Sequence, residues 1–273
     1  MSAFLEDMGA GSRARVAAAR RARPQGELER AALSAPPAPP LRLSAAGFDL
    51  IAELKLRSPA AGQLRCADEN VPARVGAYAR AGAAVVSVLT EPSRFAGSLE
   101  HLVQAAAALA PLAVPAMRKD FLVDPYQLLE ARAAGAGGVL IILRMLTRAE
   151  IDALLESARQ LGLFVLLEAF DAADIALMRE LVARPRQPQL LAGVNCRDLA
   201  TLEVVPQRLI ELAPLLPQDV PRVAESGVAG PADARRVAAA GYSLALVGSA
   251  LMTGADPEAL ARDLLAAGRA ERA

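Results

Sequence analysis

Residues 138–168 read GVLIILRMLTRAEIDALLESARQLGLFVLLE, and this stretch decides the fold that we predict. It contains two short, almost wholly apolar runs, 138–143 and 163–168, on either side of a longer segment of helical character. Strands that are apolar along their whole length are typical of a parallel sheet covered on both faces. The stretch therefore predicts one strand, one helix and a second, parallel strand.

The same alternation extends over most of the chain. From Leu50 onward, eight short apolar runs are separated by Ala-rich helical stretches, and their starts recur about every 25 to 35 residues. This number and spacing favour a (β/α)8 barrel, the TIM barrel. A doubly wound open sheet is the alternative, but it more often has about five or six strands and a Gly-x-Gly-x-x-Gly after the first of them, which is missing here. The predicted strands are 50–54, 84–89, 112–117, 138–143, 163–168, 190–195, 222–225 and 244–247.

The first part of the chain is predicted to lie outside the barrel. Residues 13–35 are rich in Ala, Arg and Glu and indicate a helix, which the sequence APPAPP at 35–40 interrupts with rigid, extended backbone. We therefore predict an N-terminal helical extension with a proline-rich linker over 1–47, followed by a barrel domain over 48–273.

The composition argues against several classes of protein. Of the 273 residues, 54% are hydrophobic and 22% are charged, so the chain can fill a large core and differs from disordered proteins. Thirty basic residues balance thirty acidic ones, which provides no overall positive field for nucleic acid or an anionic membrane. The longest apolar stretches are too short to cross a bilayer, and 1–23 lacks the apolar core of a secretory signal. We expect a cytoplasmic protein without nucleic-acid or membrane partners.

Few side chains are suited to bind a metal ion. Cys66 and Cys196 are the only cysteines and His101 is the only histidine, which is too few for a disulfide framework or a common zinc site. His101 also lies in a helix-like run and is expected on the surface. The sequence thus predicts no metal site, and acid–base chemistry falls to Glu, Asp, Lys or Tyr.

Charged residues stand where several predicted strands end, and in such barrels the loops at these ends build the active site. Glu53 and Lys55 end the first strand, two residues apart and therefore on one side of it. Lys119 ends the third strand, and Glu168 ends the fifth after an almost wholly apolar run that would desolvate it. A structural Glu53–Lys55 ion pair and a Lys119–Asp120 salt bridge are the alternatives. Catalysis is favoured, because burying so many charges without a task is costly.

The last two predicted strands end in pairs of serine and glycine, Ser226-Gly227 and Gly248-Ser249. Barrels of this kind commonly hold a phosphate there, where glycine lets backbone N–H groups approach the oxygens and serine adds a hydroxyl donor. Tight turns are the alternative use of the glycines. Two such pairs at consecutive strand ends favour phosphate binding.

Two polar residues lie at the end of the sixth predicted strand, beside this expected phosphate site. They are Asn195 and Arg197, and an arginine there can clamp a carboxylate or hydroxyl groups. Pairing of Arg197 with the neighbouring Asp198 is the alternative.

The ordered set of motifs resembles the indole-3-glycerol-phosphate synthase family. The matching segments cover the chain from about 49 to 256, and the leading helix with its proline linker is similar to the N-terminal extension of that family. Each motif is moderately specific, and the ordered set is highly specific. The segments are Ile51-Ala-Glu-Leu-Lys55 with Ser58-Pro59, Val88-Leu-Thr-Glu91 with Phe95-Ala-Gly-Ser98, Arg118-Lys-Asp-Phe121, Leu167-Glu-Ala169, Gly193-Val-Asn-Cys-Arg-Asp-Leu199, Ala224-Glu-Ser-Gly227 and Val247-Gly-Ser249.

The resemblance implies a decarboxylating lyase of tryptophan biosynthesis. Its substrate, 1-(2-carboxyphenylamino)-1-deoxy-D-ribulose 5-phosphate, is converted to indole-3-glycerol phosphate with loss of carbon dioxide and water, and no cofactor or metal is needed. The implied partner is therefore a phosphorylated small molecule. We expect the protein to be a monomer or a weak homo-oligomer.

The resemblance also implies roles for individual residues. Lys119 is implied as the acid that assists ring closure, and Glu53 and Glu168 as acid–base partners in the later proton transfers. Lys55 is implied as a ligand of a substrate anion and as a second proton donor. The other implied substrate ligands are Ser58, Phe95, Leu140, Asn195, Arg197 and Glu225, and the implied phosphate ligands are Ser226, Gly227, Gly248 and Ser249.

Two other functions are considered. A phosphoribosylanthranilate isomerase-like enzyme would lead us to expect a cysteine at the end of the first strand and an aspartate near the sixth, whereas the first strand here ends in Glu53-Leu-Lys55. A non-catalytic barrel that binds phosphorylated sugars would not need Lys119, Glu53 and Glu168 together. Binding of a substrate analogue without product formation would support that second alternative.

Overall fold

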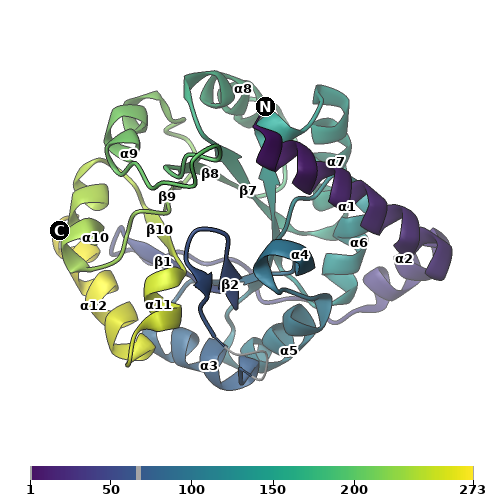
Figure 1. Cartoon of the computed structure of the whole chain (residues 1–273), viewed down its shortest axis with the longest axis horizontal. Helices are drawn as coiled ribbons and strands as arrows, with labels where there is room; N and C mark the ends of the chain where they lie inside the picture. Colours follow the sequence, from purple (N-terminus) through teal and green to yellow (C-terminus); the bar gives the residue numbers. More distant parts are fainter. Residues whose placement is uncertain (1, 66–68, 273) are drawn as a thin grey trace.

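The computed structural model describes residues 2–65 and 69–272, so Cys66 lies outside the described residues. The barrel strands are β1 (Asp49–Leu54), β4 (Val85–Leu89), β5 (Ala116–Lys119), β6 (Gly138–Ile142), β7 (Phe164–Ala169), β8 (Leu190–Asn195), β9 (Arg222–Glu225) and β10 (Leu244–Val247). All pair in parallel and close in the order β1-β10-β9-β8-β7-β6-β5-β4, which Figure 1 shows end-on. The predicted (β/α)8 barrel is confirmed.

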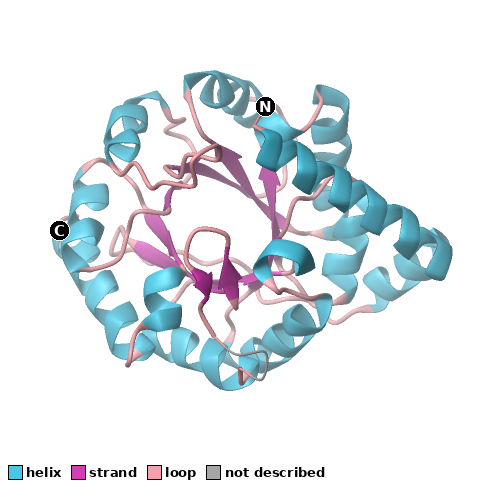
Figure 2. Cartoon of the chain, in the orientation of Figure 1, coloured by secondary structure: helices cyan, strands magenta, loops and turns pink. Residues whose placement is uncertain are grey.

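Helices surround this barrel and connect its successive strands, as Figure 2 shows. Such crossovers are required because parallel neighbours cannot be joined by a tight turn. The connecting helices are α3 (Val71–Ala81), α5 (Leu99–Leu109), α6 (Pro125–Ala133), α7 (Arg148–Leu161), α8 (Ala172–Val182), α9 (Gln207–Leu212) and α10 (Pro231–Ala239), and α12 (Pro257–Ala270) follows the last strand. Shorter elements are α4 (Pro92–Phe95), α11 (Ser249–Thr253), the hairpin of β2 (Arg57–Ser58) and β3 (Gly62–Gln63), and the 3-10 turns η1 (Ala110–Leu112), η2 (Leu143–Met145) and η3 (Ala213–Leu215).

Helix α7 illustrates how local sequence sets the limits of an element. The Thr147 hydroxyl accepts a hydrogen bond from the N–H of Glu150, whose carboxylate accepts one from the N–H of Thr147 in return. This capping box satisfies N–H groups that lack a partner inside the helix. Gly162, with φ +66°, adopts the left-handed conformation that ends the helix.

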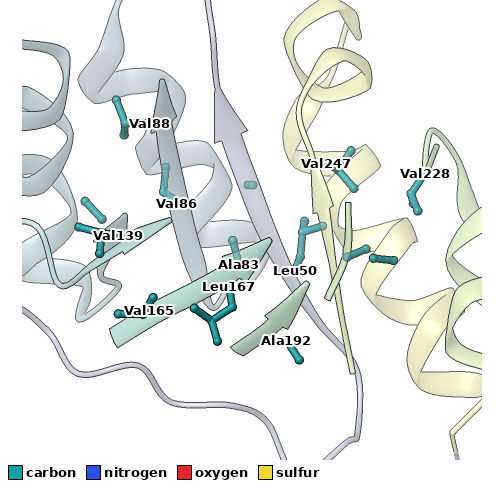
Figure 3. Packing of buried hydrophobic residues seen from close by; sticks show 14 of the residues in the cluster. Leu50, Ala83, Val86, Val88, Val139, Val165, Leu167, Ala192, Val228 and Val247 are labelled. Atoms are coloured by element: carbon teal, nitrogen blue, oxygen red, sulfur yellow. The ribbon is translucent and has the colours of Figure 1, made fainter. Parts of the chain in front are cut away.

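Alternate residues of the strands form two separate layers of packing. One set, including Leu50, Val86 and Val165, is buried with helix residues such as Leu102 in the layer between strands and helices, part of which Figure 3 shows. The other set fills the barrel interior and includes Ile51, Val85, Met117, Leu140, Leu166, Leu191, Val223 and Leu244. Because side chains alternate along a strand, the residue two places after an interior residue also points inward.

At the carboxyl ends of the strands, the next inward-facing layer is polar. Glu53 follows Ile51 by two positions, and Lys119 follows Met117 in the same way. The register places Glu168 beside Gly193, and Asn195 beside Glu225. The period of the strands therefore brings the charged residues together at one mouth of the barrel.

The N-terminal segment differs from the single helix predicted over 13–35. It forms α1 (Ala3–Ala22) and α2 (Gln25–Ser34), and the break falls at Pro24. Proline disfavours helical backbone in the residue before it, and Arg23 is accordingly extended with φ −140° and ψ 115°. In Figure 1, α1 lies along the edge of the barrel face, beside α6 and α7.

Another prediction was partly wrong, because the third strand does not extend over 112–117. Leu112 ends the 3-10 turn η1, Ala113 is left-handed with φ +56°, and β5 begins only at Ala116. Pro111 stands directly before the predicted strand and Pro115 interrupts it, and proline cannot donate a strand hydrogen bond.

The structure also places two residues for which no functional role is predicted, His101 and Cys196. His101 lies in α5 and is partly exposed, and Cys196 is buried in the packing layer outside the barrel. Within residues 2–65 and 69–272, no helix has the length and apolar character needed to cross a membrane.

Candidate active site

A cavity of about 420 Å³ opens at the carboxyl ends of the strands. Residues from the N-terminal helix, the β2–β3 hairpin and the strand ends contribute to its wall. All fourteen residues proposed from the sequence border it, namely Glu53, Lys55, Ser58, Phe95, Lys119, Leu140, Glu168, Asn195, Arg197, Glu225, Ser226, Gly227, Gly248 and Ser249. The structure thus brings these residues to one place, and their individual roles stay predictions.

Lys119 lies among three glutamates at the centre of this cavity. Its Nζ atom is 3.4 Å from Oε2 of Glu168 and 3.9 Å from Oε2 of Glu225. Burial alone would lower the pKa of Lys119, but the charges of Glu168, Glu225 and Glu53 outweigh it and raise the pKa above the usual lysine value. Lys119 is therefore held as an ammonium group that can donate a proton and stabilise negative charge.

The alternative Lys119–Asp120 salt bridge is not formed. Asp120 instead lies 2.6 Å from Arg15 and 3.4 Å from Arg118, measured between the nearest nitrogen and oxygen atoms. Because Asp120 is paired with these two arginines, it leaves Lys119 to the glutamates of the barrel mouth.

Asn195 orients Glu168 from the neighbouring strand. Its Nδ2 donates to Oε1 of Glu168 at 3.0 Å, and its Oδ1 accepts from the N–H of Arg197 at 3.0 Å. Arg197 does not pair with Asp198, because its guanidinium donates to the carbonyl of Leu202 at 2.6 Å. Glu168 is consequently held between one amide donor and one ammonium group.

Glu225 is the carboxyl group in this cluster with a strongly raised pKa. Burial is the main cause, the negative charge of Glu168 adds to it, and Lys119 offsets only part. Neither carboxyl oxygen of Glu225 has a hydrogen-bond partner among the described residues. Gly193 makes room for this group, since a Cβ atom there would lie 2.2 Å from Oε1 of Glu225. Glu225 is therefore suited to carry a proton.

Glu53 and Lys55 form the ion pair considered from the sequence, with 2.8 Å between Oε1 and Nζ. The pair packs against the backbone of Gly248, where a Cβ atom would lie 2.3 Å from Oε1 of Glu53 and 3.0 Å from Nζ of Lys55. The second oxygen of Glu53 is buried without a hydrogen-bond partner in the described part of the chain. The end of β10 thus joins this ion pair to the expected phosphate site.

The expected phosphate site lies beyond β9 and β10. Ser226 and Gly227 are both left-handed, with φ +66° and +71°, and this conformation is uncommon for serine. Ser249 begins α11, and the first N–H groups of a helix have no partner inside it. Unusual backbone of this kind is concentrated at functional sites, and it supports a binding role for this edge of the cavity.

Sequence reasoning missed most of an aromatic wall on the opposite side of the cavity. Four of the six phenylalanines border it, Phe4, Phe95, Phe121 and Phe170. The ring of Phe121 lies 5.9 Å from that of Phe4 and 6.1 Å from that of Phe95, between centroids. The motif around Lys119 could have pointed to Phe121. No comparable signal identified Phe4, which reaches the cavity only because α1 folds back over the barrel.

Comparison with protein families gives a match over almost the whole chain. A family model described as indole-3-glycerol phosphate synthase matches residues 5–264. The indole-3-glycerol phosphate synthase of Parafrankia sp. (strain EAN1pec) is 45% identical over 226 residues, 83% of this chain and 81% of the relative. That of Mycobacterium avium (strain 104) is 41% identical over 271 residues, 97% of this chain and 94% of the relative.

Solved structures share the fold at much lower sequence identity. The 3-hexulose-6-phosphate synthase of Salmonella typhimurium superposes with a TM-score of 0.62 at 15% identity, covering 82% of this chain and all of that one. The open form of tryptophan synthase from M. tuberculosis gives a TM-score of 0.55 at 17% identity, covering 81% of this chain and 93% of that one. These likenesses support the barrel fold alone.

Proposed function

Because this chain belongs to the indole-3-glycerol phosphate synthase family, we propose that the cluster around Lys119 carries out the ring closure of that family. The chain is a decarboxylating lyase of tryptophan biosynthesis. It closes the indole ring of 1-(2-carboxyphenylamino)-1-deoxy-D-ribulose 5-phosphate and releases carbon dioxide and water.

Lys119 is proposed as the general acid of ring closure. When the ring carbon that bears the carboxylate attacks the substrate ketone, negative charge develops on the ketone oxygen. An ammonium group held beside that oxygen stabilises the charge and supplies the proton. The bond to the carboxylate carbon then breaks, carbon dioxide leaves, and its electron pair restores the aromatic ring.

Dehydration then requires a proton donor at the departing hydroxyl and a base for one proton of the methylene carbon next to the nitrogen, so that the product ring keeps its N–H. Glu168 and Glu53 are proposed for these proton transfers, since they approach the cavity from different sides and each is paired with a lysine. Glu225, with its raised pKa, supports them by holding a proton close to Glu168.

The remaining residues are proposed to hold the two ends of the substrate. Ser226, Gly227, Gly248 and Ser249 form the phosphate site, while Lys55 and Ser58 bind an anionic group of the substrate. Asn195 and Arg197 position the sugar chain, and the apolar wall that includes Phe95 and Leu140 receives the aromatic ring. An apolar wall opposite a polar edge suits a substrate with a phenyl ring at one end and a phosphate at the other.

A single observation supports these assignments: Lys119 lies among three carboxyl groups that raise its pKa, in a cavity lined by phenylalanines and by the serine–glycine pairs after β9 and β10. The test is incubation of purified protein with the carboxyphenylamino-deoxyribulose phosphate while indole fluorescence is followed. Product formation that disappears in Lys119→Ala supports the assignment. Binding of the substrate without product would favour the non-catalytic alternative.

For the organisation of the protein, we propose an extension over 1–47 and a barrel over 48–273, acting as a monomer or weak homo-oligomer. One chain supplies every residue that we assign to the site, so the chemistry needs no second subunit. A cytoplasmic location is proposed because the substrate is a phosphorylated intermediate. Light scattering at working concentrations tests the quaternary state.

A further inference from the structure

Three arginines of α1 attach this helix to the barrel by ion pairs. Two of the pairs are partly exposed, and they connect α1 to the starts of α6 and α7. The third reaches the strand end that carries Lys119. The pairs are Arg13–Glu150 at 2.6 Å, Arg20–Asp124 at 2.7 Å and Arg15–Asp120 at 2.6 Å.

Arg15 differs from the other two in its buried partners. The side chains of Asp120 and Glu91, which lies 3.5 Å from Arg15, are each only 1% exposed. In contrast, the Glu150 side chain bound by Arg13 is 29% exposed. One guanidinium thus serves two buried carboxylates, of which Asp120 also lies 3.4 Å from Arg118. Removing a cation from buried carboxylates of this kind is strongly destabilising.

Asp120 fixes the backbone between two residues of the cavity, Lys119 and Phe121. Oδ1 of Asp120 accepts from Arg15 and, at 2.8 Å, from the N–H of Phe121. Its Oδ2 accepts from the hydroxyl of Thr90 at 2.7 Å. Asp120 therefore connects the end of β5, the end of β4 and helix α1.

Glu91 performs a comparable task for the loop that carries Phe95. Its carboxylate accepts hydrogen bonds from the N–H groups of three successive residues and so caps the short helix α4. Phe95 is the last residue of α4, and its ring contacts Phe121. Arg15 therefore contacts the two carboxylates that hold the backbone beside Lys119 and the short helix that carries Phe95.

We propose that Arg15 is a positioning residue, which holds Lys119 and the Phe95–Phe121 wall in their working arrangement through Asp120 and Glu91. This inference rests on the function proposed above for Lys119. Arg15 does not border the cavity, so it acts on the reaction through these two carboxylates. Helix α1 is thereby part of the support of the catalytic group as well as a cover of the cavity.

The test compares Arg15→Met with Arg13→Met, a matched change on the same helix that also removes one ion pair to the barrel. Turnover, KM and Tm are measured for both variants and for Arg15→Lys. We expect Arg15→Met to lower kcat about tenfold, because small displacements of a reacting group reduce rates strongly. Arg13→Met should change kcat less than about twofold, since exposed ion pairs contribute little. Arg15→Lys, which keeps a cation near Asp120, should recover part of the loss.

The outcomes separate positioning from simple attachment of α1. Equal kcat values for Arg15→Met and Arg13→Met, or a change in KM alone, would overturn the inference, because both variants would then only loosen the helix. If Arg15→Met is too unstable to assay, Arg15→Lys tests the inference instead. A lysine cannot reach both carboxylates as arginine does, so a kcat and Tm equal to those of the parent protein in Arg15→Lys would contradict the inference. Lys119→Ala is assayed in parallel. Normal turnover there would contradict the proposed function itself, whatever the Arg15 variants do.

Discussion

The Nζ atom of Lys119 lies 3.4 Å from Oε2 of Glu168, although the two residues are 49 positions apart and end strands that are not neighbours. Strand β6 lies between them, and its inward-facing residue at this level is the apolar Ile142, in register with Glu168. Two charged groups can therefore meet across the mouth without a competing partner from β6. An acid and a carboxylate in contact at the same cavity form the core of the proposed proton transfers.

Replacing either member of this pair should lower turnover while leaving the fold intact. General acid–base groups contribute about 10²- to 10⁴-fold in rate, so Lys119→Ala and Glu168→Gln should each reduce kcat by that order, with modest effects on the affinity for a product analogue. Lys119→Ala should be the more severe change if ring closure limits the rate, because the ammonium also stabilises charge on the ketone oxygen. Steady-state turnover and analogue binding are the measurements. Near-normal turnover of Lys119→Ala would transfer the acid role to Lys55.

The phosphate site can be tested separately from the chemistry. Ser249→Ala removes one hydroxyl donor, and a hydrogen bond to a charged group is worth about 1.5–3 kcal/mol, so KM should rise roughly tenfold or more with little change in kcat. Gly248→Ala should lower kcat as well, since its Cβ atom would lie 2.3 Å from Oε1 of Glu53. Initial rates over a range of substrate concentrations distinguish the two variants. Unchanged KM in Ser249→Ala would show that the phosphate binds elsewhere.

Stability should depend on pH through Glu225. Its pKa is raised in the folded state, so the folded protein retains a proton that the unfolded chain releases at lower pH. This contribution to stability is fully present below the usual glutamate range and is lost progressively as the pH rises above it. Glu225→Gln removes this contribution. The Tm of Glu225→Gln minus the Tm of the parent protein should therefore increase from pH 5 to pH 8. The exposed Glu211→Gln serves as the control, and a parallel course of both variants would contradict the assignment.

Removal of the N-terminal extension should affect both substrate binding and stability. A chain that begins at Leu41 retains all eight barrel strands but loses Phe4 and Leu5 from the cavity wall. Loss of apolar contact worth about 1.5 kcal/mol of substrate binding would raise KM roughly tenfold. The truncated chain also lacks Arg15, so its kcat should fall as in Arg15→Met. Tm should also fall, because Leu5, Met8 and other residues of the extension are buried against the barrel. Circular dichroism on heating and steady-state kinetics test this, and an insoluble product would show that the extension belongs to the folding unit.

The sequence was sufficient for the barrel and for the set of residues at its mouth, because both depend on short-range periodicity. Apolar runs of strand length recurred at the spacing of a βα unit, and residues two positions apart on a strand face the same side. Glu53 and Lys119 could therefore be assigned to the mouth from their places after Ile51 and Met117. Errors occurred where a single proline decided an element, as Pro24 did in the N-terminal helix.

Only the tertiary structure decided which charges meet and which carboxyl group has a raised pKa. From the sequence, Lys119 could have paired with Asp120. In the folded chain Asp120 instead accepts a hydrogen bond from Arg15, 105 positions away. The raised pKa of Glu225 arises from burial and from the charge of Glu168 on another strand, and neither can be read along one strand. Electrostatic interactions depend on distances and on burial in three dimensions, whereas the periodicity that sets strands and helices is a local property of the chain.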